Sequence, residues 1–140
     1  MMDRELQEQY YKLEMYGQQV KKLQEEFEKV ELMKMELLKS IESMKEIEKT
    51  DDIIMPLGGG AFVKVKVESQ KVIVGTGADI FVEKEIPSVI EDFEKTIEDL
   101  NSAGSMLISK IEETTKEAEK LQNELESKMG AMESMNNSAE

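Results

Sequence analysis

Two segments of the 140-residue chain carry apolar residues at alternating steps of three and four, and no other feature restricts the fold as strongly. This heptad spacing gathers the apolar side chains in one stripe of a helix, and such a helix needs a partner helix along its length. In the first segment, ten of the thirteen stripe positions are apolar or Tyr. These positions are Leu6, Gln9, Leu13, Tyr16, Val20, Leu23, Phe27, Val30, Lys34, Leu37, Ile41, Met44 and Glu48.

The second segment shows the same spacing near the other end of the chain, where eleven of fourteen positions are apolar. At 1.5 Å per residue, each segment would form a rod of roughly 65–75 Å, too long for a globular core of this chain to cover. Each rod therefore needs the other, and we expect an antiparallel coiled coil thinned or bent at Gly104 and Thr114. The stripe comprises Ile90, Phe93, Ile97, Leu100, Gly104, Leu107, Ile111, Thr114, Ala118, Leu121, Leu125, Lys128, Met132 and Met135.

The middle of the chain has a different composition, with most of the glycines and most of the valines. Apolar residues alternate with polar ones after Ala61, so that Val63, Val65 and Val67 share one face and Phe62, Lys64 and Lys66 the other. Glycine-rich or polar turns separate these short runs. The pattern predicts four strands that form two β-hairpins, over residues 53–55, 61–67, 71–75 and 79–84.

The expected fold class is α+β and mostly α, with two long helices in an antiparallel coiled coil joined by two β-hairpins. Pro87 suits the first turn of the second helix, and Glu91 and Asp92 follow where the helix dipole favours anions. Hairpins this small are not stable alone with an apolar face in water, so they predict assembly with other chains. We expect a helix over residues 1–52, hairpins over 53–86, a helix over 87–135 and a disordered tail over 136–140.

Composition excludes several function classes. The sequence has no Cys and no His, so zinc-finger, thiolate and imidazole chemistry have no residues to use. A net charge of −13 disfavours nucleic acid as a partner. The glycines at 58–60 lack the Lys of a phosphate-binding loop, and Val63 breaks the dinucleotide pattern. We therefore expect no enzyme activity, no metal and no nucleotide or other cofactor, and a soluble cytoplasmic protein without a membrane segment.

The two ends of the chain are the best candidates for a binding surface. Antiparallel helices place residues 1–16 beside residues 125–140, which brings all three Tyr close to a group of Met. Fraying of the helix ends would expose this adaptable apolar surface. Ordinary coiled-coil packing is the competing explanation for many of these positions. The candidate residues of this binding surface, to which the family resemblance below assigns client binding, are Leu6, Tyr10, Tyr11, Leu13, Met15, Tyr16, Met129, Met132 and Met135.

The hairpin region also carries a family resemblance. Residues 53–67 have the sequence IIMPLGGGAFVKVKV, and residues 72–84 have VIVGTGADIFVEK. Between two heptad-bearing helices, these segments resemble the alpha subunits of the prefoldin family, especially those of archaea. The specific part is the Pro-Leu-Gly-x-Gly before one strand and the Val-Gly-x-Gly before Val-Glu-Lys. Two hairpins indicate the alpha class, since beta-class subunits carry one.

This resemblance implies a chaperone subunit. Family members form hexamers of two alpha and four beta subunits whose hairpins build β-barrels. They capture unfolded polypeptides at the coiled-coil tips and pass them to a group II chaperonin without ATP. The alternative is a structural coiled-coil spacer or filament-forming subunit that binds no client. On this chain the resemblance would assign oligomerisation to Leu57, Val63, Val65, Val67, Val72, Val74, Ile80 and Val82.

Overall fold

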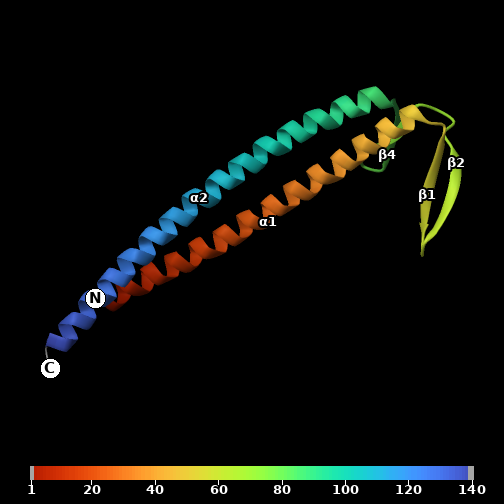
Figure 1. Cartoon of the computed structure of the whole chain (residues 1–140). Helices are drawn as coiled ribbons and strands as arrows, with labels where there is room; N and C mark the ends of the chain where they lie inside the picture. Colours follow the sequence, from red (N-terminus) through yellow and green to blue (C-terminus); the bar gives the residue numbers. More distant parts are fainter. Residues whose placement is uncertain (1, 139–140) are drawn as a thin grey trace. The chain divides into compact units, whose positions relative to one another are not determined.

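The computed structural model describes residues 2–138 of the chain (Figure 1). It has two long helices and two antiparallel hairpins, so the expected mostly helical α+β class is confirmed. The chain divides into two compact units, which we call unit 1 (Met1–Val30 with Ser102–Glu140) and unit 2 (Glu31–Asn101). The elements in order are α1 (Met2–Lys49), β1 (Asp52–Gly58), β2 (Ala61–Lys66), β3 (Lys71–Gly77), β4 (Ile80–Glu85) and α2 (Ile86–Ser138).

In unit 1, the predicted stripes of α1 and α2 face each other, and the two weak positions of α2 are among the most buried. Gly104 is buried, and a Cβ at this position would lie 3.6 Å from the Phe27 ring. Thr114 is 8% exposed and Leu125 only 3%. Gly104 and Thr114 are therefore buried positions of α2, although neither has a large apolar side chain.

Unit 2 contains a small hydrophobic core at the junction of helices and hairpins. Ile41 and Met44 of α1 pack with Ile86 and Val89 of α2, and all four are at most 6% exposed. Two valines of β3 pack against this cluster. The stripe prediction is wrong at its last position, Glu48, which is exposed, while the neighbouring Ile47 packs on the core. At this turn of α1 the residue that packs on the core is therefore the apolar Ile47, one position before the residue that the heptad spacing indicates.

The start of α2 is one residue earlier than predicted. The Ile86 N–H donates to the Gln70 carbonyl at 3.2 Å, and Pro87 is the second helical residue. Our dipole argument for Glu91 and Asp92 is wrong, because both lie beyond the first turn, where the dipole effect has fallen off. They form ion pairs instead: the Asp92 carboxylate lies 3.5 Å from Lys84 Nζ, and the Glu91 carboxylate lies 3.5 Å from Lys95 Nζ.

At its other end, α2 is longer than predicted. We expected a disordered tail over residues 136–140, but the helix continues through Asn136 and Asn137 to Ser138. Asn and Ser cost only about 0.5–0.7 kcal/mol each relative to Ala inside a helix. Adding one residue to an existing helix also forms a new hydrogen bond without a new nucleation step. The prediction is wrong for residues 136–138, and residues 139–140 lie outside the described part of the chain.

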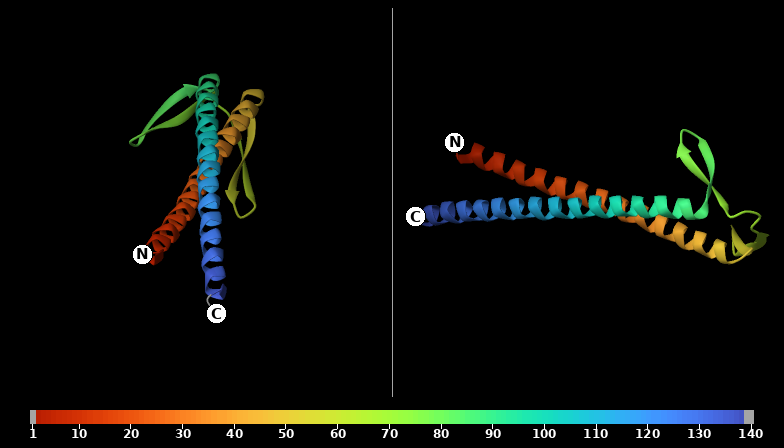
Figure 2. Two further views of the ribbon diagram at one scale, coloured as in Figure 1. Left: turned by 90° about the vertical axis from the view of Figure 1, so that its left-hand side faces the viewer. Right: turned by 90° about the horizontal axis from the view of Figure 1, so that it is seen from above.

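The strands form two separate two-stranded sheets, hairpin 1 (β1–β2) and hairpin 2 (β3–β4). The predicted turns were too long, because β1 includes residues 56–58 and β3 includes 76–77, each with a bulge near its end. The loops are the residue pairs 59–60 and 78–79, all four with positive φ, as in the tightest hairpin turns. Asp79, predicted to begin a strand, lies in the second turn. Figure 2 shows the two hairpins of unit 2 pointing in different directions.

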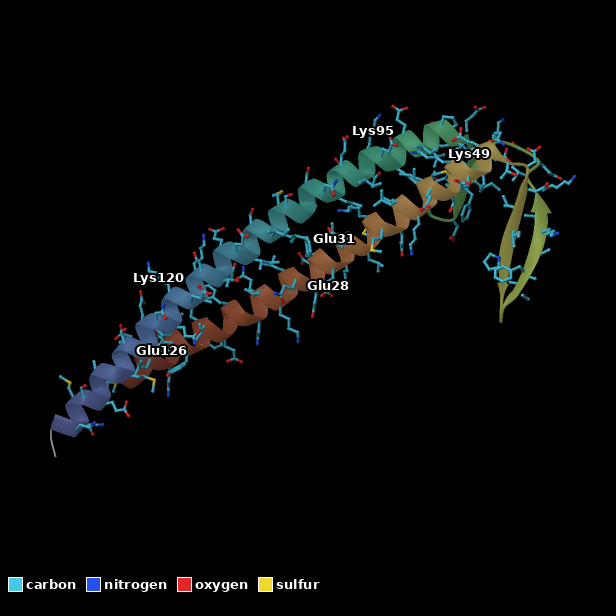
Figure 3. All side chains as sticks on the ribbon, viewed as in Figure 1. Glu28, Glu31, Lys49, Lys95, Lys120 and Glu126 are labelled. Carbon is cyan, nitrogen blue, oxygen red and sulfur yellow. The ribbon has the colours of Figure 1, made fainter. Side chains whose placement is uncertain are left out.

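Charged side chains cover the helix faces that point away from the packed stripes. In Figure 3, Glu28 of unit 1 and Lys95 of unit 2 project from such faces, and both are exposed. These charged side chains are therefore at the surface of the helices. Within residues 2–138, no helix is long and apolar enough to cross a membrane.

Candidate binding surfaces

In unit 1, the first turns of α1 lie beside the last turns of α2, as the antiparallel prediction requires. The Tyr10 hydroxyl donates to Met129 Sδ at 2.8 Å, and the Lys128 ammonium donates to Gln9 Oε1 at 3.3 Å. Both contacts join residues 119 positions apart in sequence. The Tyr-rich and Met-rich segments are therefore brought together by the helix pairing.

An open groove of about 230 Å³ lies between these helix ends, and we call it the terminal groove. Its surface is almost wholly apolar, and one acidic and one basic residue are among those that line it. A buried apolar cavity of about 150 Å³ is large enough to hold benzene, so this groove can take one large apolar side chain. It is lined by Glu5, Leu6, Lys128, Ala131, Met132 and Met135.

A second hollow of about 360 Å³ adjoins the terminal groove, and Leu6 and Met132 form a wall of both. We call it the flanking hollow; it adds Tyr10, Met129, Glu133 and Asn136 to the lining residues. Two neighbouring hollows can accept two apolar side chains from one extended segment. The unbranched Met side chains on their walls can adapt to different shapes.

Five of the nine predicted client-binding residues line these hollows: Leu6, Tyr10, Met129, Met132 and Met135. The other four lie outside them. Tyr11 and Met15 are 65% and 47% exposed, whereas Leu13 and Tyr16 are half-buried. The Lys12 ammonium lies 5.9 Å from the centre of the Tyr16 ring, a cation–π contact.

The apolar surface does not depend on fraying. Both helices are continuous through this region, from Met2 in α1 and to Ser138 in α2, yet Met135 is 73% exposed. The expected exposure is present in helices that are intact at these positions. Sequence reasoning also missed Ala131, which lies one helical turn before Met135 and was overlooked because it is off the heptad stripe.

The eight predicted oligomerisation residues divide between the two hairpins and between two environments. Val72 and Val74 pack against the core of their own unit, and Val65 and Val67 are half-buried. The remaining four are exposed by 38% to 68%. A single chain therefore leaves part of this set uncovered, namely Leu57, Val63, Ile80 and Val82.

Sequence reasoning missed a second apolar set on the hairpins. Ile54 and Phe62 of hairpin 1 are 62% and 64% exposed, and Ile73 and Phe81 of hairpin 2 are 69% and 67% exposed. These residues were overlooked because the argument followed the valine face of the alternating pattern. The sequence feature that could have indicated them is the Phe-Val pair that occurs near the start of both β2 and β4.

No site for a metal is formed by the acidic side chains of the described residues 2–138. Exposed apolar side chains gather at the helix ends of unit 1 and on the hairpins of unit 2. Both have the composition of surfaces that contact other polypeptides rather than small charged ligands.

The order of elements, with two β-hairpins in succession between two long heptad-bearing helices, defines an α+β coiled-coil subunit. The prefoldin-subunit family model matches residues 16–136, and the chain belongs to the prefoldin family. It is 62% identical to a protein named prefoldin subunit alpha from Methanococcus aeolicus, over 94% of this chain and 92% of that one. The resemblance to archaeal alpha subunits is confirmed.

Two further comparisons agree. A prefoldin subunit alpha from Methanococcus vannielii is 38% identical, over 94% of this chain and 91% of the relative. Among solved structures, the chain is similar to filamentous PFD from Methanocaldococcus jannaschii, solved by cryo-electron microscopy, with a TM-score of 0.68 and 25% identity. That match covers 82% of this chain and 98% of the other.

Proposed function

We propose that this chain is the subunit of an ATP-independent holding chaperone that captures unfolded polypeptides at the helix ends of unit 1 and delivers them to a group II chaperonin. The observation that carries the proposal is the terminal groove, an apolar hollow built by both helices and open to solvent. Family membership supports it, since the relatives named above are prefoldin alpha subunits.

The strength of one contact can be estimated from exposure. Full burial of a Met side chain contributes about 1.5–3 kcal/mol. Since Met135 is 73% exposed, a client that covers it gains roughly 1–2 kcal/mol from this side chain. A contact of this size is weak by itself. Several subunits acting on one client would bind much more tightly through avidity, while each contact stays easily reversible.

The assembly would use the hairpins of unit 2. In the proposed particle, two copies of this chain join four beta-class prefoldin subunits, and hairpins from neighbouring subunits form β-barrels. The exposed apolar residues of both hairpins support this arrangement, because they need a partner to be covered. The particle would act in the cytoplasm and would not be an enzyme.

The test is the aggregation of a chemically unfolded protein diluted into buffer without nucleotide, with this chain plus beta-class partners. We expect the double substitution Met129→Gln with Met135→Gln to weaken suppression at least severalfold, because both side chains are about half or more exposed and line the two hollows. The matched control is Met106→Gln, an exposed Met on the same helix outside both hollows, which should leave suppression unchanged.

A broader variant tests the whole cluster. Deletion of residues 1–11 together with 129–140 should leave the assembly intact, as judged by sedimentation, and should abolish suppression. Equal suppression by the double variant, the truncated chain and the wild type would refute the proposed role of the helix ends.

A second candidate function is that of a filament-forming subunit without client binding. The observation that favours it is the similarity to a filamentous PFD. Electron microscopy of the chain alone distinguishes the two functions when combined with the aggregation assay. Filaments without any suppression of aggregation would support the structural function.

A further inference from the structure

A short part of α1 in unit 2 has more apolar residues than the coiled coil can use. Five of the seven residues over 32–38 are apolar, whereas a heptad stripe needs only about two in each seven. The stripe positions in this segment are Lys34 and Leu37, both half-buried, so the stripe itself carries a lysine here. The four apolar residues off the stripe are about half exposed: Leu32 by 59%, Met33 by 51%, Met35 by 52% and Leu38 by 48%.

This exposure begins abruptly along α1. Over the preceding residues 17–31, the large apolar side chains are all on the stripe and all half-buried, namely Val20, Leu23, Phe27 and Val30. In unit 2, the large apolar residues of α2 over 86–100 are likewise buried or half-buried. Helix pairing therefore accounts for those residues but not for the exposed residues of 32–38. An exposed apolar cluster of this kind indicates a contact with another molecule.

Three of the exposed residues form one patch, and the fourth lies elsewhere on the helix. Leu32, Met35 and Leu38 follow at steps of three, so their side chains are neighbours on the helix surface. We call these three residues the outer patch. Each residue of an α-helix is rotated by about 100° from the one before it, so Met33 is turned by about 200° from Met35. Met33 therefore points to the opposite side of α1, although its exposure is nearly the same.

The outer patch continues toward hairpin 1 into a hollow of about 340 Å³. Glu42 lies four residues after Leu38, so it is the next neighbour on the helix surface. The hollow is lined by Glu42, Ser43, Glu46, Ile47, Ile53 and Ile54. A Lys or Arg side chain suits this lining, because its methylene stem packs on apolar surface while its charged end pairs with a carboxylate.

Charge restricts what can cover this surface. The helices of unit 2, over residues 31–49 and 86–101, carry ten acidic and five basic residues. Two of the five basic residues already pair within α1, since Lys34 Nζ lies 3.6 Å from Glu31 and Lys49 Nζ lies 3.7 Å from Glu46. A second copy of this chain would bring the same acidic helices, and repulsion between like charges disfavours that contact. A basic partner is favoured instead.

We propose that the outer patch and the adjoining hollow form a docking surface for an amphipathic helix with basic flanks, supplied by a protein other than a copy of this chain. A helix is the expected form, because rows of side chains at steps of three or four on one helix pack into the grooves of another. The surface from Leu32 to Glu46 extends for about 21 Å along α1, so a partner helix of about 14 residues covers it. The proposal does not depend on client capture at the helix ends of unit 1.

Binding of a synthetic peptide to the full chain tests the proposal, measured by fluorescence anisotropy at physiological salt. The probe is a labelled helical peptide of about 16 residues, with Leu along one face and Lys on both flanks. Met35→Gln should weaken binding roughly fivefold, because it removes the apolar contact of a side chain that is 52% exposed. The matched control is Met33→Gln, which should leave the affinity unchanged.

The charge requirement is tested separately. Glu42→Gln with Glu46→Gln should weaken binding severalfold, whereas Glu94→Gln with Glu98→Gln, an equal loss of charge at exposed positions of α2, should not. A peptide with Glu in place of each Lys should bind much more weakly than the basic one. A peptide of the same composition in scrambled order should also bind weakly, because its Leu side chains no longer share one face. Circular dichroism should show the same helix content in every variant, since Met, Glu and Gln have similar helix propensities.

Three results would overturn the proposal: a Met35→Gln variant that binds like the wild type, an equal loss in Met33→Gln, or an acidic peptide that binds as tightly as the basic one. Met129→Gln with Met135→Gln should bind the peptide like the wild type. A loss of binding in that variant would show that the peptide is held as a client at the helix ends, and the docking surface would be wrong.

The same titration on the particle formed with beta-class subunits tests the partner that we assign. Retained binding supports a partner from outside the particle. A loss of binding there would show that a neighbouring subunit covers the outer patch, and our assignment would be wrong. Failure of the proposed chaperone function is seen separately, in the aggregation assay with the Met129 and Met135 substitutions.

Discussion

The packing of unit 1 predicts that replacing Gly104 by Ala stabilises the protein. Gly104 is in the interior of α2 and is buried against Phe27 and Val30 of α1. An added Cβ would lie 3.6 Å from the Phe27 ring and 3.9 Å from Val30, ordinary contact distances at which no atom has to move. A conformationally free residue thus occupies a position where Ala also fits.

The size of the effect follows from two terms. Ala is about 0.8–1 kcal/mol more favourable than Gly in a helix interior. Partial burial of the new methyl group adds up to about 0.8 kcal/mol. The free energy of unfolding should therefore rise by roughly 1–1.5 kcal/mol. For a chain of this size, each 1 kcal/mol raises the melting temperature by about 2–4 °C.

Thermal unfolding followed by circular dichroism measures the shift, at one fixed protein concentration because assembly also affects the melting temperature. The matched control is Gly17→Ala, an exposed helix position with no neighbouring atom within 4 Å of the added Cβ. In this control the substitution raises helix propensity but adds no packing contact. The difference between the two variants therefore isolates the contact of the new methyl group with Phe27 and Val30.

A lower melting temperature for Gly104→Ala, alongside a higher one for Gly17→Ala, would refute the contact geometry in this part of unit 1. Gly104→Leu provides the opposite limit. Its larger side chain has no room between the helices, and overpacking of this kind costs about 1–3 kcal/mol. A melting temperature equal to that of the Ala variant would show that the helices separate freely at this position.

Two further predictions concern unit 2. Val74→Asp should lower the melting temperature by several degrees as well as weaken assembly, because it places an unpaired charge against the hydrophobic core of unit 2. Leu57→Asp changes a side chain that is 68% exposed, so it should weaken assembly with little change in melting temperature. Equal melting temperatures, with sedimentation of both variants as control, would contradict the packing of β3. Lys84→Met breaks the ion pair between Lys84 and Asp92, whose side chains are 41% and 53% exposed respectively. Because exposed ion pairs stabilise a protein only weakly, the unfolding free energy measured by denaturant titration should change by less than about 1 kcal/mol. A larger loss would show that this pair anchors hairpin 2.

The heptad spacing predicted the helices and their packed stripes well, because burial along a long helix depends mainly on periodicity. The errors lie where a local contact decides the outcome. Glu48 is exposed because Ile47 reaches the core, and α2 begins at Ile86 because its N–H has an acceptor in Gln70. A spacing rule contains no information about which of two adjacent residues finds such a partner.

The hairpins show a different limit of sequence reasoning. Their existence followed from alternation and glycine, but the turn lengths did not, because Ala78 and Asp79 adopt a positive φ that residues other than Gly adopt uncommonly. Sequence reasoning also missed that the paired positions of hairpin 1 recur in hairpin 2 with an offset of 19 residues, because alternation and glycine content do not give the strand register.

The two exposed apolar surfaces differ in the stiffness of their side chains, and this difference fits the two proposed roles. The helix ends present Met129, Met132 and Met135, which are unbranched and can adopt many rotamers. The hairpins present Val, Ile and Phe, and the β-branched residues among them have few rotamers. A stiff surface loses little entropy on meeting one fixed partner of matching shape, whereas an adaptable surface can cover many different client segments weakly. Residue choice thus favours fixed assembly at the hairpins and reversible capture at the helix ends.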